Sequence, residues 1–243
     1  MIIDFHMHVG EDLAGERANL DDIKQQMQKN GIDKACVFPF NCPDPVAESI
    51  DLLKLDDSFI PFLRFDPNMI TRQQLHMALK HPFKGVKLHA RSQNFHPDDP
   101  AFTWIFEELR EHKLPILIHT KDSIMEPMSD PRKVLTIARQ FPDITFVLAH
   151  CAGGERWVWQ EIASLPNVYV ETSIFSLPLV FEYAYKRYGF DRFIYGSDYP
   201  YSYPEIELKK IELARIPSEL KEKILYKNAL KVLKMETVIE EEV

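Results

Sequence analysis

Four histidines and one aspartate follow short apolar segments of the chain. His6 and His8 close the first such segment, His119 follows Leu-Ile, His150 follows Leu-Ala, and Asp198 follows Gly-Ser. Imidazole and carboxylate groups are good ligands for zinc and other borderline divalent metals. Three or four of them with an open position make a catalytic site. The set predicts a metal centre.

The spacing of the first pair supports this interpretation. Side chains two apart on a strand share one face, so His6 and His8 would project together. A single histidine at a strand end is more often a hydrogen-bonded filler, and one His-x-His pair occurs in many chains by chance. The case for a metal therefore depends on all five residues standing at strand exits.

Eight apolar, β-branched or aromatic segments would carry these residues. Their starts lie 24 to 33 residues apart, about the length of one strand, one helix and two short connections. Each interval therefore predicts one βα unit. The segments are Ile2 to Phe5, Ala35 to Phe38, Phe59 to Phe65, Gly85 to Leu88, Leu114 to Ile118, Ile144 to Ala149, Val168 to Val170 and Phe193 to Tyr195.

Helical spacing of apolar residues fills the intervals, for example around Leu75 to Leu79, Phe102 to Leu109 and Pro131 to Phe141. Further helical patterns run from Pro204 to Met235, and the tail from Glu240 to Val243 is expected to fray.

Eight βα units in 243 residues predict an α/β fold, a (β/α)8 barrel, for which about 250 residues is typical. We expect one domain over residues 1–243 with a short C-terminal helical extension. A doubly wound sheet would normally offer a Gly-rich first turn, but this chain has His-Met-His-Val-Gly there.

The composition of the chain narrows the classes of molecule that it is expected to bind. The 37 acidic residues exceed the 29 basic ones, which gives a formal charge of -8 and opposes binding to nucleic acid or anionic lipid. No apolar run approaches the roughly 20 residues of a membrane span. The 3 cysteines form no Cys-x-x-Cys pair. We expect a cytoplasmic protein with a small-molecule substrate, and leave homo-oligomerisation open.

The chain resembles the amidohydrolase superfamily, within it the amidohydrolase-related (amidohydrolase 2) branch of TIM-barrel hydrolases and decarboxylases. The segments that carry the resemblance stand in the family's order and span nearly the whole chain. They are Ile3-Asp4-Phe5-His6-Met7-His8, Gly85-Val86-Lys87-Leu88-His89, Pro115-Ile116-Leu117-Ile118-His119-Thr120, Val147-Leu148-Ala149-His150-Cys151-Ala152-Gly153-Gly154, Tyr195-Gly196-Ser197-Asp198-Tyr199-Pro200 and Ile224-Leu225-Tyr226-Lys227-Asn228-Ala229.

The resemblance implies that His6, His8 and His119 hold a divalent metal, with Asp198 as a further ligand or as the base facing its water. We expect Zn²⁺, with one ion favoured over two. Such an ion lowers the pKa of a bound water from about 15.7 to about 7 and polarises a carbonyl. His150 would polarise the carbonyl or stabilise an oxyanion. The alternatives are a second-metal ligand or a structural histidine.

Lys87 allows two interpretations. In two-metal relatives a carboxylated lysine on the fourth strand bridges the ions. Lys87 shares a face with His89, however, and its ammonium could instead bind a substrate carboxylate, which we favour. Arg64 and Arg91 could add to this anion site, although a salt bridge would account for each at least as well.

We expect a metal-dependent hydrolase of an amide, lactone or ester of a small, carboxylated molecule. The alternative is a non-oxidative decarboxylase on the same site. A barrel deoxyribonuclease fits poorly because those enzymes have a glutamate where this chain has Lys87. A noncatalytic scaffold would require a vestigial site, yet every ligand is present. The short βα loops predict an open, modest pocket, with Val9 to Asn19 and Ala90 to Pro100 as its most polar edges.

Overall fold

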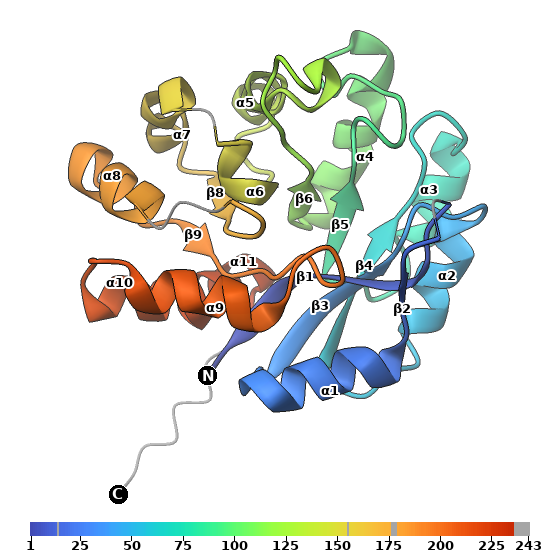
Figure 1. Ribbon diagram of the computed structural model, residues 1–243. Coiled ribbons are helices and arrows are strands. Elements are labelled where there is room, and N and C mark those ends of the chain that lie inside the picture. The colour runs from blue at the N-terminus through green and yellow to red at the C-terminus, as the bar shows by residue number, and fades with distance from the viewer. Residues whose placement is uncertain (14, 155, 176–178, 236–243) are drawn as a thin grey trace, which may run out of the picture.

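The computed structural model describes residues 1–13, 15–154, 156–175 and 179–235 (Figure 1). The expected frayed tail, Glu240 to Val243, lies outside these residues. In this part of the chain, no helix is long and apolar enough to cross a membrane.

The sheet follows the sequence order of its strands, with the single exception of a short edge strand. All eight predicted strands are present, and they pair in parallel with one another. With the additional edge strand β2, the order across the sheet is β2-β1-β3-β4-β5-β6-β7-β8-β9. The strands are β1 (Ile3–Glu11), β2 (Arg17–Ala18), β3 (Lys34–Pro39), β4 (Phe59–Arg64), β5 (Gly85–Leu88), β6 (Ile116–Ile118), β7 (Phe146–Leu148), β8 (Val168–Glu171) and β9 (Phe193–Ile194).

The last strand returns to the first and closes the sheet. Met7 and Tyr199 form a parallel bridge. The backbone N–H of Phe5 donates to Tyr195 O at 3.0 Å, and that of Asp198 donates to His6 O at 2.7 Å. These bonds join the two segments that carry the predicted ligands, so closure of the barrel is also what assembles the site. The predicted (β/α)8 barrel is confirmed.

β1 is longer than the predicted Ile2 to Phe5 segment and contains a register shift between Asp4 and Met7. Phe5 packs in the inner core with Ile3, whereas Met7 packs in the outer core. Strict alternation would put all three on one face. The shift therefore lets Phe5 fill the barrel while His6 lines the cavity. The far end of β1 also pairs antiparallel with β2, a hairpin that the sequence analysis missed.

Helices surround the sheet (Figure 1), and the predicted helical segments are confirmed. They are α1 (Leu20–Asn30), α2 (Pro45–Leu52), α3 (Arg72–Ala78), α4 (Thr103–His112), α5 (Pro131–Gln140), α7 (Trp159–Ser164), α8 (Leu179–Tyr188), α9 (Pro204–Leu213), α10 (Ser218–Glu222) and α11 (Asn228–Leu233). Three short 3₁₀ turns, Pro100–Phe102, Pro127–Ser129 and Arg156–Val158, and one π-helical turn, Lys223–Lys227, complete the set. The segment Ala149–Ala152, labelled α6, is a left-handed turn.

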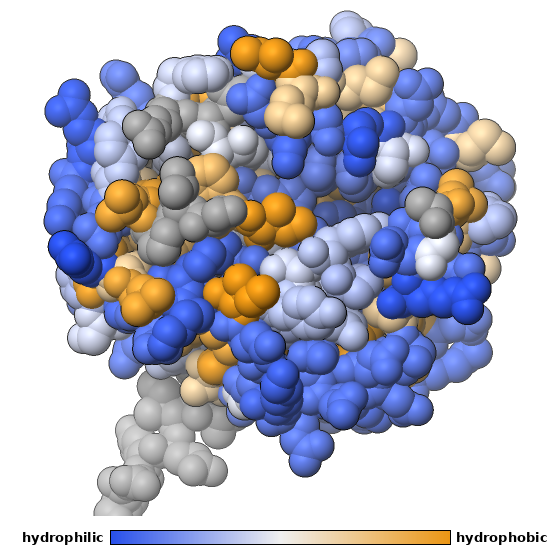
Figure 2. Space-filling model, viewed as in Figure 1, coloured by the Kyte–Doolittle hydropathy of each residue, from blue (hydrophilic) through white to orange (hydrophobic). Residues whose placement is uncertain are grey.

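Two apolar clusters make the core. The outer one lies between strands and helices, and the inner one fills the barrel with side chains such as Phe5, Phe38 and Phe62. Leu230 and Leu233 of α11 belong to the inner cluster, so the C-terminal extension closes one end of the barrel. The face seen in Figure 2 is mostly hydrophilic, with hydrophobic side chains scattered over it.

Candidate active site

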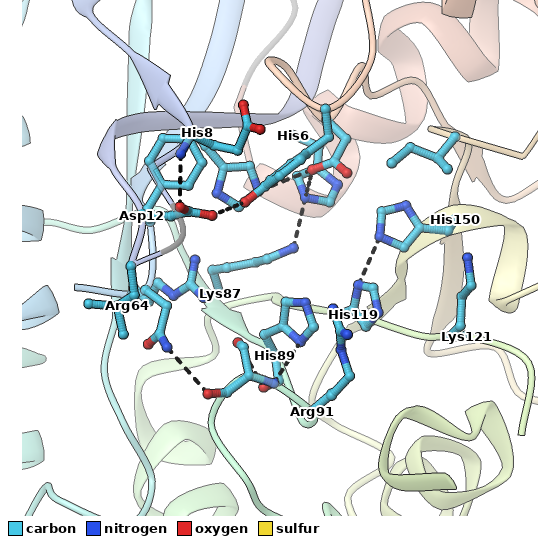
Figure 3. A pocket seen from close by; sticks show the side chains of 18 of the residues that line it. His6, His8, Asp12, Arg64, Lys87, His89, Arg91, His119, Lys121 and His150 are labelled. Atoms are coloured by element: carbon cyan, nitrogen blue, oxygen red, sulfur yellow. Dashed lines mark hydrogen bonds and ion pairs between the residues drawn. The ribbon is translucent and has the colours of Figure 1, made fainter. Parts of the chain in front are cut away.

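A cavity of about 490 Å³ opens at the carboxyl ends of the strands, within the range typical of small-molecule sites. Both loops predicted to edge it contribute: Asp12, Leu13 and Glu16 from the first, and Arg91 and Ser92 from the other. All the predicted site residues line it, as Figure 3 shows in part: His6, His8, Arg64, Lys87, His89, His119, His150 and Asp198.

His6, His8 and Asp198 converge in this cavity. Oδ1 of Asp198 lies 2.9 Å from Nε2 of His6 and 3.0 Å from Nε2 of His8. One ligand atom from each of the three buried residues lies within 4.8 Å of the other two. Two imidazole nitrogens and a carboxylate oxygen are a donor set that divalent zinc or manganese accepts. The residues therefore fit the predicted metal.

The protonation of this group follows from burial and from the charge of Asp198. Burial alone would raise the pKa of Asp198, but the charge of His6 and hydrogen bonds from His6 and His8 hold it well below its usual value. Burial alone would lower the pKa of His6, but the charges of Asp198 and Glu171 outweigh burial, and the pKa of His6 is raised above its usual value. Burial lowers the pKa of His8 to about 3. His8 is therefore neutral at pH 7, with one ring nitrogen free of a proton.

Several pocket residues occupy the left-handed backbone region. The φ angle is 58° at both His150 and Asp198 and 61° at Ile174. Such conformations cost of order 1 to 3 kcal/mol each for residues other than glycine, and they cluster at functional sites. Asp198 keeps this conformation through its bond to His6 O and by accepting from the N–H of Tyr201 at 2.8 Å. The chain thus holds its site residues at some cost in stability.

His119 pairs with His150 and lies outside the group formed by the other three predicted ligands. Its Nδ1 lies 2.9 Å from Nε2 of His150, and its Nε2 lies 3.1 Å from Oε2 of Glu126. Among the described residues, two buried groups are placed to hold a metal ion, His6 with His8 and Asp198, and His6 with His150 and Glu171, and neither includes His119. Glu126 belongs to the loop after β6 and was not singled out in the sequence, where nothing distinguishes it from other surface acids.

Lys87 and His89 contact histidines of the pocket. Lys87 Nζ lies 2.8 Å from Nε2 of His6 and 5.0 Å from the ring centre of Phe38. Burial lowers the pKa of Lys87 to about 7. The ring of His89 stacks on His119 with centroids 3.7 Å apart, and burial lowers its pKa well below the usual value. His89 is therefore neutral and supports His119.

Arg64 presents unused hydrogen-bond donors to the pocket. Its side chain is buried and donates from one terminal nitrogen to Pro39 O at 3.0 Å. Among the described residues, its Nε has no hydrogen-bond partner and no carboxylate forms a salt bridge with it. In Figure 3 it lies across the pocket from His150 and Lys121. A buried cation with free donors is a ready receptor for an anion.

Two further features of the site were not among the predicted site residues. Glu171, which ends β8, is fully buried and accepts from Nδ1 of His6 at 3.0 Å. Its position at a strand end is the same signal that identified the histidines, and could have found it. Phe40 stacks on His8 at 4.9 Å, while Tyr201 donates to Asp12 at 2.7 Å. Together they form an aromatic wall beside His8.

Comparison with known proteins agrees with this geometry. The sequence matches the amidohydrolase family over residues 3–235. The chain belongs to the amidohydrolase family. This confirms the predicted family and makes the protein an enzyme. No curated protein sequence matches this amidohydrolase.

Solved structures share the fold of this amidohydrolase over 96 to 97% of its length. An uncharacterised TIM-barrel protein from Bordetella bronchiseptica is 20% identical, with a TM-score of 0.76 and 98% of its chain covered. A putative 2-pyrone-4,6-dicarboxylic acid hydrolase from Pseudomonas putida is 16% identical, with a TM-score of 0.74 and 98% covered. A dihydroxybenzoic acid decarboxylase from Polaromonas, with bound manganese and the inhibitor 2-nitroresorcinol, is 14% identical, with a TM-score of 0.74 and 97% covered.

Proposed function

We propose that this amidohydrolase is a metal-dependent hydrolase of a lactone, amide or ester in a small, carboxylated molecule. The observation that carries the proposal is the position of Asp198, whose Oδ1 lies within 3.0 Å of Nε2 of both His6 and His8. One carboxylate there can both hold a divalent ion and transfer a proton.

His6, His8 and Asp198 would hold the ion, with His119 proposed as a further ligand. Imidazole and carboxylate ligands suit Zn²⁺, the ion predicted from the sequence, and also Mn²⁺, which the Polaromonas structure contains. A divalent ion bound there would activate water at neutral pH and polarise the substrate carbonyl.

Asp198 is positioned for proton transfer. Its pKa lies well below the usual value, so it is ionised and can accept the proton of the attacking water. The same carboxyl group can then protonate the leaving oxygen or nitrogen, which returns it to its starting state. His150 lines the same cavity, and we assign it the second catalytic position.

Arg64 supports a carboxylated substrate. Burial lowers its pKa to about 10, so the guanidinium stays charged at neutral pH. A substrate carboxylate would supply the direct ion pair that no described carboxylate forms with Arg64. This favours hydrolysis over decarboxylation because a carboxylate anchored on a buried cation is stabilised as an anion, whereas decarboxylation must remove that charge.

Decarboxylation remains the second candidate because the Polaromonas enzyme, which shares the fold, is a decarboxylase with bound manganese. We would assay lactones and cyclic amides for acid release and carboxylated aromatics for carbon dioxide release. We expect acid release from at least one carboxylated lactone or amide. Carbon dioxide release without any acid release would establish the decarboxylase and refute the hydrolase.

We expect the purified protein to contain one tightly bound divalent ion per chain. Replacement of His119 by Ala should lower the metal content after dialysis, since a three-ligand site binds less tightly than a four-ligand one. Elemental analysis measures this directly. His81, which is exposed and outside the pocket, supplies the control variant His81→Ala. Full metal content in His119→Ala would show that His119 is not a ligand.

A further inference from the structure

Glu171 lies beneath the cavity, fully buried at the end of β8. Four hydrogen-bond donors converge on its two oxygens. Oε1 accepts from the backbone N–H of Ser173 at 2.5 Å. Oε2 accepts from Nδ1 of His6 at 3.0 Å, from Oγ of Ser173 at 2.9 Å and from the backbone N–H of His150 at 3.3 Å. A carboxylate surrounded in this way acts as an acceptor in every contact.

Gly196 makes the space that this carboxylate occupies. A Cβ built on Gly196 would collide with the carboxylate of Glu171. The φ angle of Gly196 is not among the positive ones, so backbone freedom does not explain the glycine. The glycine is explained instead by the close approach of the Glu171 carboxylate, which leaves no room for a Cβ. The Gly-Ser-Asp segment that carries Asp198 is thus shaped around Glu171.

The contact with His6 decides which ring nitrogen faces the cavity. Because the carboxylate only accepts, Nδ1 of His6 must carry a proton to bond with it. Nε2 is then the nitrogen that remains for a ligand, and it is the atom that lies near Asp198 and Lys87. A carboxylate that orients a histidine through its distal nitrogen is a common support for metal ligands.

Ser173 links Glu171 to a chain of pocket histidines. Its hydroxyl oxygen lies 2.9 Å from Oε2 of Glu171 and 2.9 Å from Nδ1 of His150. Nε2 of His150 lies 2.9 Å from Nδ1 of His119, whose Nε2 lies 3.1 Å from the carboxylate of Glu126. Because Glu126 also acts only as an acceptor, the proton positions on His150 depend on His119 and Glu126 as well as on Ser173.

We propose that Glu171 is a positioning residue that makes His6 present Nε2 to the cavity through its contact with Nδ1. The importance of this role rests on the proposed metal-dependent function. The protonation of the histidine ring nitrogens does not depend on that function, and it can be measured in metal-free protein.

The test is ¹⁵N NMR of the histidine rings in the full-length, metal-free protein. We expect a protonated Nδ1 in His6. Ser173→Ala should alter the ring signals of His150 and leave Nδ1 of His6 protonated. Glu171→Gln should alter both rings. Thr172→Val is the matched control because the buried Thr172 hydroxyl has no hydrogen-bond partner among the described residues.

Zinc affinity gives a second readout, measured by competition with a chromophoric chelator. Glu171→Gln should weaken Zn²⁺ binding by roughly 10- to 100-fold. Thr172→Val should not change it. Gly196→Ala should also weaken zinc binding because it displaces the Glu171 carboxylate. This variant provides the test of zinc affinity if Glu171→Gln does not fold.

Two results would overturn the proposal: a wild-type His6 with no proton on Nδ1, or unchanged zinc affinity in both Glu171→Gln and Gly196→Ala. A wild-type protein that binds no zinc or manganese would instead refute the metal-dependent function, while the NMR result would still decide the role of Glu171.

Discussion

Replacement of Asp198 by Asn should lower turnover by about 10²- to 10⁴-fold, the contribution expected of a residue that transfers a proton. The amide keeps the shape of the side chain but accepts no proton. It also removes the charge that raises the pKa of His6. Turnover measured at saturating metal separates lost proton transfer from lost metal binding.

The fold should survive this substitution. Asn is among the residues that tolerate the left-handed region, and Asp198 has a φ of 58°. We expect the unfolding midpoint to shift by only a few degrees, equivalent to about 1 kcal/mol. Asp130→Asn is the matched control, since Asp130 is a buried N-cap of α5 outside the pocket and Asn caps equally well. A wild-type rate in Asp198→Asn would contradict the proposed mechanism.

The position of the site could be predicted from the sequence because a closed parallel barrel brings all its strand ends to one face. Once His6, His119, His150 and Asp198 are recognised as ends of strands, they must meet there whatever the loops do. The burial of His6, His150 and Asp198 is also expected, since each follows an apolar segment.

The internal pairing of those residues could not be predicted. The register shift in β1 begins at Asp4, whose Oδ1 accepts from the backbone N–H groups of His6 and Ser197 at 3.0 Å each. That contact spans nearly the whole chain, so no local pattern reports it. His119 faces His150 partly because Glu126 bonds to its other nitrogen, and loop conformations of this kind are set by tertiary contacts.

Replacement of Arg64 by Met should stabilise the protein and damage substrate binding at the same time. Burial lowers the pKa of Arg64 from 12.5 to about 10. A base whose pKa is depressed on folding destabilises the folded state below that pKa, here on the order of 3 kcal/mol at neutral pH. Met fills a similar volume without a charge, so the unfolding midpoint should rise by several degrees.

The same variant should bind carboxylated ligands less tightly. Hydrogen bonds to charged groups contribute about 1.5 to 3 kcal/mol, so we expect KM for a carboxylated substrate to rise roughly 10- to 100-fold. The preference for the free acid over its methyl ester should disappear. Calorimetry with a carboxylate ligand and thermal unfolding measure the two effects separately.

Arg91→Met is the matched control. Arg91 also lines the pocket, but it is 62% exposed and already paired with Glu126 at 3.3 Å. An exposed pair contributes about 0 to 1 kcal/mol, so this variant should change stability and KM little. If Arg64→Met lost stability and kept its preference for the acid, Arg64 would be a structural cation. A gain in stability together with loss of that preference is expected only if the folded protein holds the buried charge for its ligand.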